Sequence, residues 1–202
     1  MTVPPRRPDD QPDAAEETLL RSDYPFRGKL LTLRVDLVRT PDGRESRREI
    51  VEHPGAVAVV PLLPDGRVIL IRQYRRPTGQ ALLEIPAGTR EPDEDAPACA
   101  HRELIEEIGY RAGRLERLGG FYTSPGFCTE YMDVFVATDL HPVEGEDAAE
   151  FEEAMEIIRP EEAAGLLASG SPIDAKTLAA LLLLTGHESR GAEERGGGGA
   201  GG

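Results

Sequence analysis

The segment from residue 88 to 110, GTREPDEDAPACAHRELIEEIGY, constrains the fold more than any other part of the chain. Asp95 is a candidate N-cap with Pro97 in the first helical turn, and Gly109 interrupts the pattern at the other end. Apolar side chains between them recur at every fourth position: Ala100, Leu104 and Ile108. The segment therefore predicts a loop followed by a short helix that buries one stripe of side chains.

Glutamates crowd one side of this expected helix. Glu103 and Glu107 border the apolar stripe, while Glu106 points further out. Only Glu106 has a basic residue four positions earlier, Arg102, and like charges at this spacing repel each other by roughly 0.2 to 0.5 kcal/mol. The cluster is either a solvated acidic face or a metal site, because a divalent cation would relieve the repulsion.

The spacing of the whole segment carries a family resemblance. The fixed positions are Gly88, Glu94, Arg102-Glu103-Leu104, Glu106-Glu107 and Gly109-Tyr110. This pattern resembles the Nudix box, Gx5Ex7REUxEExGU with U aliphatic or aromatic, and every defined position fits if Tyr110 is accepted at the last. So long a match with fixed gaps favours the metal site over the solvated face.

In Nudix hydrolases the box binds Mg²⁺ or Mn²⁺ beneath the diphosphate of a nucleoside diphosphate derivative, and the resemblance implies two or more ions here. It makes Glu103 and Glu107 the main metal ligands, with Glu106 serving a further ion and the backbone carbonyl of Ala87 completing the shell. Glu107 is thereby also a candidate catalytic residue. The structural box positions are Gly88, Glu94, Arg102 and Gly109: the glutamate and the arginine would brace the loop, and the glycines would allow tight turns.

Further segments are similar to the ADP-ribose pyrophosphatase branch of this family. They are REIVEHPGAVAVV, IRQYRRPTG, LLEIPAG, TSPGF and IDAKTLAAL, in this order along the chain. Pro125 in TSPGF lies close to the position of a proline that marks the branch. The resemblance implies that Arg48 and Arg75 contact the phosphates, although each arginine alone would be read as a surface ion pair. Glu130 would position substrate or metal, and Phe26 would complete the adenosine pocket of a partner subunit.

The implied reaction is metal-dependent hydrolysis of ADP-ribose to AMP and ribose 5-phosphate by in-line attack of water. A glutamate of the acidic segment 141–153 would act as general base; we favour Glu150, with Glu153 next, and the alternative is a merely solvated loop. The same chemistry on a nucleotide sugar, FAD, NADH or a dinucleoside polyphosphate is an alternative function. A non-catalytic Nudix module that senses ADP-ribose is a second alternative.

Strand-like segments interspersed with a few helical ones predict a mixed α/β fold. The resemblance implies a Nudix fold, a curved mixed β-sheet sandwiched by helices, with an N-terminal antiparallel hairpin at 24–53 and a Nudix domain at 54–186. A second, more buried hairpin is expected from residues 55–76 around Pro64-Asp65-Gly66. The ends, 1–23 and 187–202, are expected to be disordered because they are poor in apolar residues.

The formal net charge of −14 argues against nucleic acid and anionic membranes as partners. Converging arginines or a bound cation could still create a site for a small anionic substrate. Two cysteines, an N-terminus without an apolar stretch, and the lack of an apolar run near ~20 residues predict a soluble, cytoplasmic protein. The half-exposed N-terminal strands suit a homodimer, which is the state of the relatives in this branch.

Overall fold

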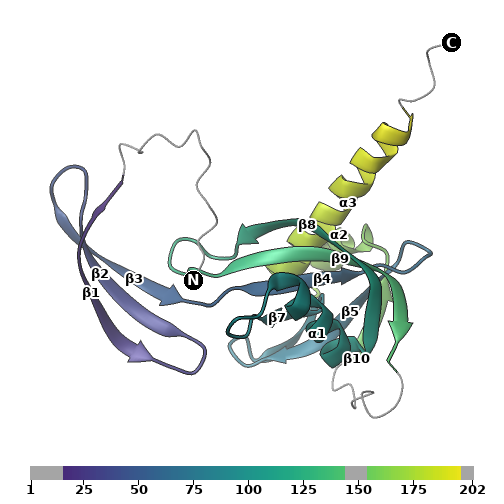
Figure 1. Cartoon of the computed structure of the whole chain (residues 1–202), viewed down its shortest axis with the longest axis horizontal. Coiled ribbons are helices and arrows are strands. Elements are labelled where there is room, and N and C mark those ends of the chain that lie inside the picture. The colour runs from purple at the N-terminus through teal and green to yellow at the C-terminus, as the bar shows by residue number, and fades with distance from the viewer. Residues whose placement is uncertain (1–15, 144–153, 197–202) are drawn as a thin grey trace. The chain divides into compact units, whose positions relative to one another are not determined.

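The computed structural model of the chain describes residues 16–143 and 154–196. The chain divides into two compact units, one made of Met1–Gly55 with Tyr122–Glu130 and one made of Ala56–Phe121 with Tyr131–Gly202. Strands and helices are both present, so the predicted mixed α/β class is confirmed. Each unit has its own sheets (Figure 1).

The first unit contains an antiparallel sheet with the order β1-β2-β3. Its strands are β1 (Thr18–Arg27), β2 (Thr32–Arg39) and β3 (Glu45–Glu52). The β2–β3 turn closes where the N–H of Gly43 donates to the carbonyl of Thr40, and Gly43 has a φ of 86° that favours glycine. The expected hairpin around Pro41-Asp42-Gly43 is therefore confirmed.

Strand β1 lies partly in a segment that was expected to be disordered. Thr18 pairs with Arg39 and Ser22 with Asp36, so residues 18–23 belong to the sheet. The expectation was wrong for these residues because pairing with β2 satisfies their backbone groups, which composition alone does not reveal. The N-terminal hairpin is thus a three-stranded sheet.

The segment 122–130 attaches to the far edge of β3. The N–H of Val51 donates to Phe127 at 2.7 Å, and the N–H of Thr129 donates to Val51 at 3.0 Å. The side chain of Thr129 also accepts the N–H of His53 at 3.0 Å. These bonds fix the residues around Pro125 against β3 although they lie far away in sequence.

The second unit contains two sheets, with the orders β7-β4-β9-β8 and β10-β5-β6. The strands are β4 (Ala56–Pro61), β5 (Val68–Arg75), β6 (Gln80–Glu84), β7 (Ala87–Thr89), β8 (Tyr110–Tyr122), β9 (Tyr131–Pro142) and β10 (Ala154–Ile158). Strands β4 and β9 are parallel, and β4 is antiparallel to β7. The strands of the curved mixed sheet that was expected are therefore divided between two sheets.

The expected second hairpin was wrong. Its two strands, β4 and β5, form in the expected places but belong to different sheets. Near the turn they are connected by a bridge between Leu62 and Val68 and by hydrogen bonds from the N–H of Leu63 to Arg67 and from the N–H of Gly66 to Leu63. Beyond the turn, β4 pairs with β7 and β9, whereas β5 pairs with β6 and β10.

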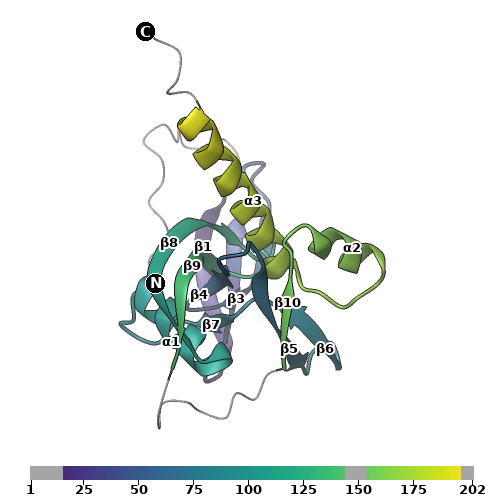
Figure 2. The same cartoon turned by 90° about the vertical axis from the view of Figure 1, so that its right-hand side faces the viewer.

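Two helices cover opposite faces of β4 (Figures 1 and 2). Helix α3 (Ala175–Gly196) packs Ala180 and Leu184 on the face that contains Ala58 and Val60. Helix α1 (Ala96–Ile108) packs on the face that contains Val59. The alternation along β4 thus separates two apolar cores, one under each helix.

Helix α2 (Glu162–Ala168) precedes α3. Helix α3 continues to Gly196, into the segment 187–202 that was expected to be disordered, so that expectation was wrong for residues 187–196. Among the residues that the structure describes, no helix combines the length and the apolar character needed to cross a membrane.

Candidate active site

Helix α1 begins and ends where the sequence predicts. The side chain of Asp95 accepts the N–H of Ala98 at 2.8 Å, and a proline occupies the first turn. Gly109 has a φ of 69°, and its N–H donates to the carbonyl of Ile105. This left-handed cap ends the helix and is a conformation that glycine adopts readily.

The buried stripe of α1 presents two glutamates to the short strand β7. Ala100, Leu104 and Ile108 are buried as predicted, and Cys99 and Glu103 are buried beside them. A Cβ added to Gly88 would lie 1.7 Å from Oε1 of Glu103. Gly88 is therefore required for the close approach of Glu103, and not for the tight turn that the resemblance implied; its φ lies outside the left-handed region.

Glu107 of α1 contacts Ala87, the residue that precedes Gly88 on β7. Its Oε2 accepts the backbone N–H of Ala87 at 2.9 Å. Burial, with a smaller contribution from the negative charge of Glu103, raises the pKa of Glu107 to about 7 against the lowering effect of that hydrogen bond. Burial also raises the pKa of Glu103. Two desolvated carboxylates close to β7 are thus left without full charge compensation.

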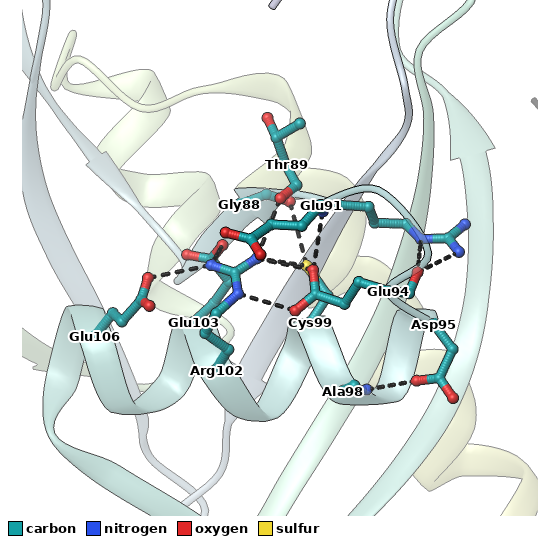
Figure 3. A network of polar contacts seen from close by, with 11 residues as sticks. Gly88, Thr89, Glu91, Glu94, Asp95, Ala98, Cys99, Arg102, Glu103 and Glu106 are labelled. Atoms are coloured by element: carbon teal, nitrogen blue, oxygen red, sulfur yellow. Dashed lines mark hydrogen bonds and ion pairs between the residues drawn. The ribbon is translucent and has the colours of Figure 1, made fainter.

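Arg102 joins the preceding loop to the helix, as Figure 3 shows. Its Nε and Nη2 donate to the two carboxylate oxygens of Glu94 at 2.9 and 3.0 Å, and Nη2 also donates to the carbonyl of Thr89 at 3.2 Å. These hydrogen bonds lower the pKa of Glu94 to about 2. The contacts have the geometry of the brace that the resemblance implies.

The remaining donors of Arg102 reach two other glutamates. Its Nη1 lies 2.6 Å from Oε1 of Glu103 and 3.1 Å from Oε2 of Glu106. The inference that Glu106 alone pairs with Arg102 was therefore wrong, because it counted only helical i, i+4 neighbours. The side chain of Glu106 is 57% exposed and is directed to Arg102 (Figure 3).

The donor set is compatible with a hard cation but is not a closed cage. Within residues 16–143 and 154–196, no group of three or more His, Cys, Asp or Glu side chains could hold a metal ion. Glu103 and Glu107 supply two carboxylates, with the backbone of Ala87 next to Glu107. Mg²⁺ commonly uses one or two carboxylates and fills its other positions with water and phosphate oxygens. The residues present therefore fit such an ion.

Arg75 lies on β5 and is held by a buried carboxylate. Its Nε and Nη2 donate to Glu84 at 2.9 and 2.7 Å, and Glu84 is 1% exposed. Lys176 at the start of α3 also contacts Glu84, and it contacts Asp174 as well. Sequence reasoning assigned no role to these three partners, although Glu84 in LLEIPAG is a charge in an otherwise apolar strand.

The first unit brings together two of the predicted substrate-binding residues. Arg48 and Pro125 both line a cavity of about 440 Å³, together with Arg34, Arg47 and the segment that ends at Thr129. Nε of Arg48 donates to Glu17 at 3.0 Å. Three arginines and an apolar segment make this cavity suitable for an anionic ligand with an apolar part.

Glu130 and Phe26 also belong to the first unit but do not line this cavity. Oε2 of Glu130 accepts the hydroxyl of Thr123 at 2.7 Å, and Nε2 of His53 lies 3.7 Å from Oε1. Phe26 is 59% exposed on β1. The candidate general bases, Glu150 and Glu153, lie outside the described residues.

Comparisons with known proteins show which family the chain resembles. Residues 52–181 match the NUDIX domain, and residues 17–51 match the N-terminal domain of nucleoside diphosphate sugar hydrolases. The chain is 41% identical to an ADP-ribose pyrophosphatase of Bacillus subtilis (strain 168), covering 89% of this chain and 98% of the relative. It is 38% identical to a methanol dehydrogenase activator of Bacillus methanolicus, covering 86% and 95%. A crystal structure of an ADP compounds hydrolase superposes with a TM-score of 0.73 at 27% identity, covering 84% of this chain and 92% of the other.

Proposed function

The chain belongs to the Nudix family, and on this basis we propose that it hydrolyses the diphosphate of ADP-ribose to AMP and ribose 5-phosphate. The observation that carries the proposal is the pair of carboxylates beside β7, the buried Glu103 and the partly buried Glu107. The 41% identity to an ADP-ribose pyrophosphatase over nearly the whole of that relative supports the choice of substrate.

Mg²⁺ or Mn²⁺ is the proposed cofactor, in two or more ions. Glu103 and Glu107 would hold it, with the carbonyl of Ala87 as a backbone ligand and Glu106 released from Arg102 to serve a further ion. When bound, a divalent cation neutralises phosphate charge and makes an attacking water more acidic. The brace between Glu94 and Arg102 keeps the loop before α1 in place while the carboxylates act.

The arginines are the proposed phosphate contacts. Within the part of the chain that the structure describes, Nη1 of Arg75 makes no hydrogen bond, so one edge of its guanidinium is available. Arg48 would bind phosphate after exchanging its contact with Glu17, and Pro125 would shape the wall beside it. Glu130 would position substrate or metal from the orientation that Thr123 gives it.

The proposed general base is Glu150, with Glu153 as the second choice. Either carboxylate would take a proton from the attacking water before in-line displacement at phosphorus. Glu107 would contribute to the same step by holding the cation, which would make the water more acidic.

A homodimer through the N-terminal strands is also proposed. Strand β1 is an edge strand and presents exposed apolar side chains, among them Leu19, Tyr24 and Phe26. A second copy would cover them, and Phe26 would then face the adenosine pocket of the partner. We further propose a cytoplasmic location, in keeping with two free cysteines.

Another nucleoside diphosphate derivative is the second candidate substrate. The match of residues 17–51 to a domain named for nucleoside diphosphate sugar hydrolases favours a nucleotide sugar. A sensor without catalysis is less well supported, since all box glutamates are present.

A substrate panel tests the proposal. Purified protein with Mg²⁺ or Mn²⁺ is expected to release AMP and ribose 5-phosphate from ADP-ribose faster than it cleaves GDP-mannose, FAD or NADH, and EDTA is expected to stop the reaction. Faster cleavage of another compound would overturn the substrate, and binding of ADP-ribose without turnover would favour the sensor.

A further inference from the structure

The guanidinium of Arg75 is fixed on one edge and open on the other. Two parallel hydrogen bonds hold Nε and Nη2 on Glu84, a geometry that fixes the plane of an arginine as well as its position. The side chain of Arg75 is 39% exposed, whereas that of Glu84 is 1% exposed. A residue outside the catalytic box therefore decides where the open edge of Arg75 points.

Glu84 is itself held from a helix that begins far away in sequence. Lys176, one of two lysines in the chain, bridges Glu84 and Asp174, and its side chain is 10% exposed. The other carboxylate oxygen of Asp174 accepts the N–H of Thr177 at 3.0 Å. The hydroxyl of Thr177 in turn accepts the N–H of Ile85 at 2.9 Å. The first turn of α3 is thus tied to the side chain of Glu84 and to the backbone of Ile85, the next residue.

The four charged side chains form a neutral group, with Arg75 and Lys176 facing Glu84 and Asp174. Glu84 lies three residues before Ala87, whose N–H donates to Oε2 of Glu107 at 2.9 Å. The group is therefore joined through residues 85–87 to the strand that contacts the carboxylates of the box.

We propose that Glu84, Lys176 and Asp174 are positioning residues that direct the open Nη1 edge of Arg75 to a phosphate oxygen of the substrate. The inference rests on the proposed function, because it takes Arg75 as a phosphate contact. The new element is that residues at the start of α3 act on the active site, because Lys176 and Asp174 hold Glu84 and Glu84 holds Arg75. A buried ion pair is weak evidence for stability on its own, so a role in fixing geometry is the stronger explanation for this network.

A double-mutant cycle in kcat/KM for ADP-ribose tests the inference. Arg75→Gln is expected to lower kcat/KM by roughly 10- to 100-fold, because it removes a charged contact to phosphate. Lys176→Met is expected to lower it by roughly tenfold, mainly through KM, because the arginine is misplaced. Since Lys176 acts through Arg75, the double variant is expected to match Arg75→Gln alone.

Two further variants separate this role from a loss of stability. Asp174→Asn keeps an oxygen for the N–H of Thr177 but weakens the hold on Lys176, so a smaller loss in the same direction is expected even if Lys176→Met folds poorly. Arg72→Met removes an arginine of the same strand whose partner is the exposed Glu156, and it is expected to leave kcat/KM unchanged. All variants are assayed well below their unfolding temperatures.

Each outcome has a distinct meaning. Multiplicative losses in the double variant, or an unchanged kcat/KM in both Lys176→Met and Asp174→Asn, overturn the positioning role while the proposed function stands. An active Arg75→Gln variant overturns the inference together with the phosphate contact of Arg75. Wild-type protein that does not turn over ADP-ribose overturns both the inference and the proposed function.

Discussion

Two carboxylates in the second unit, the buried Glu84 and the partly buried Glu107, have opposite electrostatic surroundings. Burial alone would raise the pKa of Glu84, but the hydrogen bonds of Arg75 and the charge of Lys176 outweigh it and lower the pKa. Burial raises the pKa of Glu107 to about 7, although its Oε2 accepts the N–H of Ala87. Desolvation thus acts on both groups, but the charge of Glu84 is satisfied by partners within the chain whereas Glu107 keeps a raised pKa.

The largest effect on stability is expected when the charge of Glu84 is removed. Glu84→Gln should lower the free energy of unfolding by about 3–5 kcal/mol, because Arg75 and Lys176 lose their shared anion. Urea denaturation measures this. Glu156→Gln is the matched control, since Glu156 pairs with Arg72 at 2.7 Å but both side chains are substantially exposed, and it should cost under about 1 kcal/mol. If both variants lost the same free energy of unfolding, the buried ion network of Glu84 would be no more stabilising than the exposed pair of Glu156.

Activity should respond most strongly at the uncompensated carboxylate. Glu107→Gln is expected to lower kcat by a factor on the order of 10² to 10³, because it removes a proposed metal ligand, while the unfolding temperature stays equal or rises. Steady-state kinetics with saturating Mg²⁺ and thermal unfolding measure both. Glu91→Gln, an exposed change in the loop before α1, is the control and should retain activity. Full activity in Glu107→Gln would refute the metal assignment.

Added Mg²⁺ should raise the free energy of unfolding only where the proposed metal ligand Glu107 is present. Mg²⁺ at a hundredfold excess over its dissociation constant should stabilise the wild-type protein by about 2.7 kcal/mol. The gain should be largely lost in Glu107→Gln and kept in Glu156→Gln, with a monovalent salt of equal ionic strength as the control. An equal gain in wild type and Glu107→Gln would place the ion elsewhere.

The pH dependence of stability without metal separates Glu107 from Glu94. Because the folded pKa of Glu107 is raised from 4.5 to about 7, its contribution to stability is fully present below about pH 4.5 and is lost as the pH rises through 7. Glu94 should behave in the opposite sense: its pKa is lowered to about 2, so its contribution is present above about pH 4.5 and is lost as the pH falls to 2. Unfolding in EDTA from pH 2 to 8 should show that Glu107→Gln removes the first slope and Glu94→Gln the second. Variants with the wild-type profile would contradict these assignments.

The limits of sequence reasoning follow from the same residues. The ends of α1 were predictable because Asp95 and Gly109 act within one helical turn. The partners of Arg75 were not, because Glu84 and Lys176 are 92 positions apart and no local pattern relates them. The role of Gly88 was misread for a similar reason, since the atom that requires a glycine there belongs to Glu103 on another element.

By itself the sequence determined the box helix, its buried stripe and the pair of glutamates beside it, together with the β2–β3 hairpin. These features depend on periodicity, caps and turn residues that act over a few positions. Only the tertiary structure decided that β4 pairs with β9 instead of β5, that residues 18–23 join a sheet, and which carboxylate is neutralised. Those outcomes depend on which strand edges remain free and on which charges meet in the folded chain. Local propensity determines neither of these, because both involve residues far apart in sequence.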